Sequence, residues 1–216
     1  MFRWLEGRIM IGVLLILAGL IFLVDSLFPA FNLGGLFWAA AFGLGGLVFL
    51  SVFFSNRAEW WPIIPGFTLI GISLVIFLGE FAPGNLEELG GGVFLGMIGL
   101  SFLVIYLLRR DNWWAIIPAG VLMTLAAIAT LSVFGWDEDG VALGGLLFFG
   151  IGLTFVLVAL LPTAEGRMTW AWIPAGIMLA MGVLLTMSSF ELMRYIWPAA
   201  LILVGLVMVA RSLFRR

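Results

Sequence analysis

Apolar residues run along this chain in eight long segments that carry no charged side chain, and short polar stretches separate them. An α-helix rises about 1.5 Å per residue, so about 20 residues cross the hydrocarbon core of a bilayer. The pattern therefore predicts an all-α, polytopic integral membrane bundle of eight transmembrane helices. The predicted spans are 9–24, 33–55, 60–79, 89–108, 113–136, 141–161, 170–190 and 195–210.

Composition narrows the class of protein further. Apolar residues make up 64% of the 216 positions and charged residues 10%, whereas soluble domains hold about 45 to 50% and 25%. The short loops leave no room for a soluble domain, so we expect one transmembrane domain over 1–216. The chain has no histidine and no cysteine, and all ten basic residues are arginine. Disulfides, thiolate or imidazole metal sites and Schiff-base chemistry are thereby excluded.

The charges separate by side once these spans are drawn. One side receives nine arginines and four carboxylates, and the other receives eight carboxylates and Arg194. Excess arginine in short loops marks the cytoplasmic side, so both termini are predicted to be cytoplasmic. The arginine-rich side holds Arg3, Arg8, Arg57, Arg109, Arg110, Arg167, Arg211, Arg215 and Arg216.

Tryptophans support the same arrangement, because they open the odd-numbered spans where an amphipathic ring lies at headgroup level. The predicted interface anchors are Trp60, Trp61, Trp113, Trp114, Trp170, Trp172 and Trp197. A proline follows three of these groups, at Pro65, Pro118 and Pro174. Proline near a helix start costs little, so we interpret these as helix-start residues, with hinges as the alternative.

A repeat of about 53 residues underlies the pattern. Gly-Leu pairs begin at Gly46, Gly99, Gly152 and Gly205, each 53 residues after the last. The repeat unit is a helical hairpin, with units at approximately 1–57, 58–111, 112–167 and 168–216. Each unit contains two helices, so successive hairpins enter the membrane in the same orientation. The fold is therefore predicted to consist of four parallel helical-hairpin repeats, in contrast to the inverted repeats of many transporters.

Small residues three or four apart on one helical face indicate close helix packing. Gly92, Gly96 and Gly99 form one such series, and Gly46 ends another. We take Gly46, Gly92, Gly96, Gly99, Gly152 and Gly205 as helix-packing candidates. Packing inside one bundle and a face for a partner helix are both compatible with this pattern.

The spans offer little material for chemistry. Every Asp, Glu and Arg lies in a loop or at a helix end, so no catalytic residue, cofactor or metal ligand is predicted, and the chain is expected not to be an enzyme. The acidic run Asp137, Glu138 and Asp139 either binds a hard cation or is an ordinary solvated outer loop. The glycine-rich stretches lack a preceding strand and a Walker lysine, and no basic domain indicates nucleic acid as a partner.

Both ends of the chain resemble the LiaI/LiaF-like transmembrane region family of bacterial envelope-stress membrane proteins. Residues 11–27 carry Gly12, Gly19, Leu23 and Asp25 of its first helix motif, and residues 195–216 carry the second motif. The second motif matches at Trp197, Pro198, Leu201, Ile202 and Gly205. The paired tryptophans give a weaker likeness to HdeD-like multi-hairpin membrane proteins.

The resemblance implies a protein of the bacterial cytoplasmic membrane that acts by protein contact. Together with the uncharged spans, it favours a non-enzymatic accessory or scaffold subunit of a membrane complex, or an envelope-stress-associated membrane protein. Expected partners are membrane lipids and other membrane subunits or a second copy. The alternative is a transporter, channel or lipid translocase with a path between the hairpins. A third hypothesis is an enzyme that acts on lipid through its carboxylate side chains.

Overall fold

The computed structural model describes residues 33–136, 140–163 and 166–188, with isolated positions 16, 19, 23, 27, 198, 201, 202 and 205. Within these residues, six helices are long and apolar enough to cross a membrane, so the chain is a polytopic integral membrane protein. The prediction of eight spans is corrected to six candidate spans. The predicted first span, 9–24, and last span, 195–210, lie outside the continuously described residues.

The helices begin and end close to the predicted positions, because length and hydropathy fix where a chain crosses the hydrocarbon core. The largest differences are three residues. A short turn or 3₁₀ segment occupies the predicted starts at 60 and 113, before the α-helices begin at Ile63 and Ile116, and the predicted end at 136 lies beyond Val133. The elements are α2 Leu33–Ser55, α3 Ile63–Phe81, η2 Gly84–Leu89, α4 Gly90–Leu108, η3 Trp113–Ala115, α5 Ile116–Val133, α6 Val141–Leu160, β1 Pro162–Thr163, β2 Gly166–Arg167, η4 Thr169–Ala171 and α7 Trp172–Ser188.

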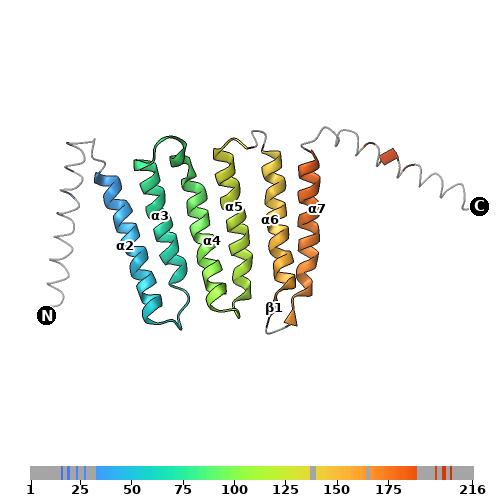
Figure 1. Cartoon of the computed structure of the whole chain (residues 1–216), viewed down its shortest axis with the longest axis horizontal. Helices are drawn as coiled ribbons and strands as arrows, with labels where there is room; N and C mark the ends of the chain where they lie inside the picture. The colour runs from blue at the N-terminus through green and yellow to red at the C-terminus, as the bar shows by residue number, and fades with distance from the viewer. Residues whose placement is uncertain are drawn as a thin grey trace, which may run out of the picture.

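The six described helices lie side by side in a single row, with α2 and α7 at its opposite ends (Figure 1). Each helix packs on its neighbours in sequence, and alternate helices run in opposite directions. Packing is most extensive between α2 and α3, α4 and α5, and α6 and α7, and least extensive between α5 and α6. Over the described residues, the hairpins therefore form an open row and not a closed ring.

The connections divide the row into two edges (Figure 1). The loops from α2 to α3, α4 to α5 and α6 to α7 lie at one edge, which we call the arginine edge. Among the described residues, it carries Arg57, Arg109, Arg110 and Arg167 with two carboxylates, Glu59 and Asp111.

The opposite, acidic edge holds the connections from α3 to α4 and from α5 to α6. Its described charges are Glu80, Glu87 and Glu88. The predicted separation of charges therefore holds over the described residues. The other charged residues of that prediction, including Arg194 and the acidic run 137–139, lie outside them.

Each of the three prolines is the third residue of its α-helix: Pro65 in α3, Pro118 in α5 and Pro174 in α7. The first four N–H groups of a helix have no carbonyl partner within it, so a missing N–H costs little there. Their placement agrees with the helix-start interpretation.

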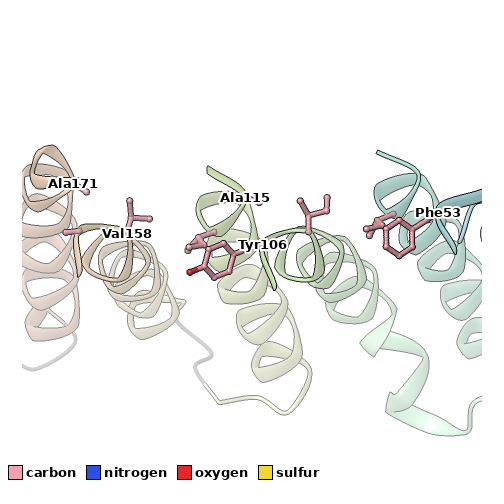
Figure 2. Close-up of a cluster of buried hydrophobic side chains, with 9 residues drawn as sticks. Phe53, Tyr106, Ala115, Val158 and Ala171 are labelled. Atoms are coloured by element: carbon pink, nitrogen blue, oxygen red, sulfur yellow. The ribbon is translucent and has the colours of Figure 1, made fainter. Parts of the chain in front are cut away.

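The most buried apolar side chains gather toward the arginine edge (Figure 2). They come from the ends of α2, α4 and α6 and from the segments that begin α3, α5 and α7. Each helix, or the short segment that precedes it, thus contributes to one cluster that crosses the row. Its buried members are Phe53, Ile63, Ile105, Tyr106, Ala115, Ile116, Val158, Ala159 and Ala171.

Candidate functional site

Several of the contacts between neighbouring helices contain a glycine on each helix. At the α2–α3 contact, a Cβ atom placed on Gly46 falls 2.7 Å from the carbonyl oxygen of Gly66 and 2.7 Å from Cγ1 of Ile70. A Cβ on Gly66 falls 2.8 Å from Cδ2 of Leu50. Leu50 follows Gly46 by four residues, as Ile70 follows Gly66, and residues four apart share one helix face. Each glycine therefore accommodates the side chain that lies one turn from the opposing glycine.

The α5–α6 contact repeats this geometry with threonines. A Cβ on Gly120 meets the side chain of Thr154, and a Cβ on Gly150 meets the side chain of Thr124. Each hydroxyl donates a 2.8 Å hydrogen bond to the carbonyl oxygen four residues earlier in its own helix, Thr124 to Gly120 and Thr154 to Gly150. The methyl and hydroxyl groups therefore fill the space that the missing side chains leave.

The α6–α7 contact has the same form. A Cβ on Gly145 meets Oγ1 of Thr186, and a Cβ on Gly182 falls 3.0 Å from Cδ2 of Phe149. Farther along α6, a Cβ on Gly152 falls 2.8 Å from Cγ of Leu179.

The predicted glycine stripe of α4 faces α5. A Cβ on Gly92 meets Oγ1 of Thr130, one on Gly96 falls 3.6 Å from Cβ of Ala126, and one on Gly99 falls 3.1 Å from Cγ of Met123. A Cβ on Gly205 meets no atom within 4 Å, so its packing role stays a prediction. The other five packing candidates all lie against a neighbouring helix of the same chain.

The sequence predicted glycine stripes on single helices. It did not predict that two neighbouring helices each place a glycine against a side chain of the other. The available signal was a shared Gly-x₃-Thr spacing in three successive helices, at Gly120 and Thr124, Gly150 and Thr154, and Gly182 and Thr186. It also missed one hydrogen bond between helices, in which Oγ of Ser73 on α3 donates to the carbonyl oxygen of Ala39 on α2 at 2.6 Å.

One groove opens between α2 and α3 and another between α4 and α5. The first, of about 560 Å³, lies beside Gly43 and Ser73, and the second, of about 460 Å³, lies beside Gly96 and Thr130. Gly43 and Gly96 are 53 residues apart, so the grooves occupy equivalent places in the repeat. Their linings are almost wholly apolar, and they lack the convergent polar groups of a reactive site.

Six of the seven tryptophans predicted as interface anchors lie at the arginine edge, in or beside the turns that precede α3, α5 and α7. Trp61 lies in a turn and Trp60 directly precedes it, Trp113 and Trp114 lie in η3, and Trp170 lies in η4. Trp172 is the first residue of α7, and Trp197 lies outside the described residues. These six tryptophans thus occupy a single level of the row, as interface anchors require, whereas Trp38 near the start of α2 and Trp136 after α5 lie toward the acidic edge.

Two arginines of this edge have defined contacts. Nη2 of Arg109 donates hydrogen bonds to the carbonyl oxygens of Arg57, at 2.9 Å, and Ala58, at 2.8 Å. The guanidinium carbon of Arg110 lies 4.5 Å from the ring centroid of Tyr106, a cation–π distance. Arg109 therefore connects the end of α4 to the loop between α2 and α3.

Metal chemistry has no candidate in the described part of the chain, which contains no group of three His, Cys, Asp or Glu residues able to hold an ion. The acidic run Asp137, Glu138 and Asp139 lies outside it, so its cation binding stays untested.

No protein-family model matches the chain, and no curated protein or solved structure matches it either. The resemblance to the LiaI/LiaF-like region therefore stays a prediction. Three of its nine motif residues, Gly12, Asp25 and Trp197, lie outside the described residues, and the other six are among the isolated described positions.

Proposed function

We propose that this protein is a non-enzymatic scaffold or accessory subunit of a membrane complex, acting through contacts between its helices and those of a partner. The open row carries the proposal. A helix inside the row contacts two neighbours, which leaves part of its surface on each broad face of the row available. Such a row offers a long, flat contact surface within the bilayer.

The exposed side chains on the row are large and apolar. Val48 on α2 is 62% exposed, Leu153 on α6 is 60% exposed and Ile173 on α7 is 70% exposed. Lipid tails are as apolar as these side chains, so van der Waals fit and small residues decide between lipid and protein neighbours. Grooves beside Gly43 and Gly96 provide such fit along the same row.

A path through the chain is the alternative function, and the arrangement of the described helices supports it less. Selective pores and transport sites are lined by polar groups that several helices surround. The six described helices form an open row, so a path would require further helices to close it, either from outside the described residues or from another chain.

The proposed location is the bacterial cytoplasmic membrane, with both termini in the cytoplasm and with envelope stress as the proposed setting. The arginine edge supports the orientation, because short arginine-rich loops stay on the cytoplasmic side. The setting rests on the resemblance of the chain ends.

Site-specific photocrosslinking in native membranes tests the proposed function. A photoreactive residue replaces Val48, Leu153 or Ile173, and the matched control replaces Val158, which lies on the same helix as Leu153 but is 2% exposed. We expect a discrete adduct with a second membrane protein from at least one exposed position and none from Val158.

Mild-detergent extraction supplies the second readout. We expect a particle that contains the same second protein in a fixed ratio to this chain. Adducts with lipid alone, together with a particle of this chain alone, would refute the proposal. Flux of solute or lipid through vesicles that contain the purified chain would favour the alternative.

A further inference from the structure

An Arg-x-x-Trp sequence recurs in the three described loops of the arginine edge. It runs from Arg57 to Trp60, from Arg110 to Trp113 and from Arg167 to Trp170. An Ile-Pro pair follows each time, ending at Pro65, Pro118 and Pro174 in the first turn of the next helix. The same pair of residues thus recurs in three loops, and these loops lie along one edge of the row (Figure 1).

The side chains of this motif are placed for a membrane interface. All three arginines are exposed, while Trp60 and Trp113 are half-buried and pack against the apolar cluster at this edge. Indole rings favour headgroup depth, and arginine binds phosphate through two parallel N–H donors. Among the described residues, this edge carries four arginines and two carboxylates, which leaves an excess of positive charge.

Two of the three loops are held together. Nη2 of Arg109 bonds the carbonyl oxygens of Arg57 and Ala58, and the rings of Trp60 and Trp114 meet at 5.5 Å with an interplanar angle of 64°. Arg57 and Arg110 therefore project from neighbouring, fixed loops.

The contact of Arg110 leaves its donors usable. Its guanidinium carbon lies over the ring of Tyr106, 4.5 Å from the centroid, and contact with one ring does not engage all five N–H donors of a guanidinium. A guanidinium held against a ring is also oriented before a ligand arrives, so less rotamer freedom is lost on binding.

We propose that the Arg-x-x-Trp loops form a binding site for the phosphate headgroup of an anionic phospholipid. The loops of Arg57 and Arg110 form its centre and the loop of Arg167 extends it along the row. The tryptophans hold this edge at headgroup depth while the guanidiniums bind phosphate. The site does not depend on the proposed scaffold function.

Native mass spectrometry of the full chain tests the site, with phosphatidylglycerol and phosphatidylcholine of identical acyl chains as the probes. The test variant changes Arg57, Arg110 and Arg167 to Gln. The matched control changes Arg211, Arg215 and Arg216 to Gln, which removes the same charge outside the motif. One arginine near a membrane surface is worth about a fivefold change in affinity for anionic lipid.

We expect phosphatidylglycerol affinity to fall more than tenfold further in the loop variant than in the control, with phosphatidylcholine affinity unchanged in both. Equal losses in the two variants would show general charge attraction and overturn the site. Equal binding of the two lipids by the unchanged chain would overturn it as well.

Further variants and a competition experiment separate phosphate recognition by arginine from the effect of charge alone. Arg110→Lys retains the charge but loses the paired donors, and we expect an intermediate affinity from it. If the loop variant fails to fold, judged by helix content and gel filtration, Arg110→Gln alone replaces it and is expected to bind about fivefold more weakly. Displacement of phosphatidylglycerol by millimolar inorganic phosphate would assign the site to a free anion and overturn the lipid proposal.

Discussion

Glycine has one structural role at several helix contacts, which is to let the side chain of the next helix reach the backbone. Between helices in lipid the hydrophobic effect supplies no attraction, so contact depends on close van der Waals packing. Gly120 and Gly150 show the principle, since each receives the threonine that lies one turn from the other. A methyl group at either position would occupy space that the threonine already fills.

Gly120→Ala is therefore expected to destabilise the chain by about 1 to 3 kcal/mol, the usual cost of overpacking. A Cβ on Gly120 falls 2.5 Å from Cγ2 of Thr154, and the backbone of α5 would have to move to relieve the overlap. The measurement is the free energy of unfolding in mixed micelles titrated with a denaturing detergent.

Gly144→Ala is the matched control. A Cβ on Gly144 meets no atom within 4 Å, so the change is expected to be neutral or to stabilise by up to about 1 kcal/mol through helix propensity. Adding Thr154→Ala to Gly120→Ala should restore part of the lost stability. If Gly120→Ala and Gly144→Ala change the free energy of unfolding equally, the close packing of Gly120 against Thr154 does not contribute to stability.

At the scale of the element, the helices that leave the arginine edge begin in a shared way. A short turn or 3₁₀ segment carries the tryptophans, and proline is the third residue of the α-helix that follows. Proline fixes φ near the helical value and needs no donor at that position. The connection therefore defines where each helix starts without weakening its hydrogen bonds.

Pro118→Ala is expected to change the free energy of unfolding by no more than about 1 kcal/mol, mainly through the entropy of the unfolded chain. Ala127→Pro, at an exposed position in the middle of the same helix, is expected to cost about 3 kcal/mol or more. Detergent unfolding measures both. A loss at Pro118→Ala as large as that at Ala127→Pro would contradict the helix-start role.

At the scale of the whole molecule, the row has two chemically different edges. The described arginines lie at one edge, and Glu80, Glu87 and Glu88 lie at the other. Because the helices alternate in direction, a single orientation in the membrane places all three arginine loops on the same side. The positive-inside rule then predicts that this side is cytoplasmic.

The chain contains no cysteine, so single introduced cysteines report the orientation directly. Phe134→Cys, at a position that is 66% exposed on the acidic edge, is expected to react with a membrane-impermeant maleimide in intact bacterial cells. Ala58→Cys, exposed on the arginine edge, is expected to react only after the membrane is permeabilised. The reverse labelling pattern would invert the proposed topology.

The sequence by itself determined where the described helices lie and how the charges separate. The predicted span 33–55 coincides with α2 Leu33–Ser55, and the predicted span 141–161 ends one residue beyond α6 Val141–Leu160. Both results follow from local properties, because hydropathy over about 20 residues decides whether a segment crosses a bilayer. The separation of charges follows once the spans are known.

Only the tertiary structure decided that the described helices form an open row and how its contacts are made. The pairing of Gly120 with Thr154 and the bonds from Arg109 to Arg57 and Ala58 join residues more than 30 positions apart. A helix with small residues on one face is compatible with several neighbours. The choice among them depends on the fit of two surfaces, which the order of residues in one helix does not contain.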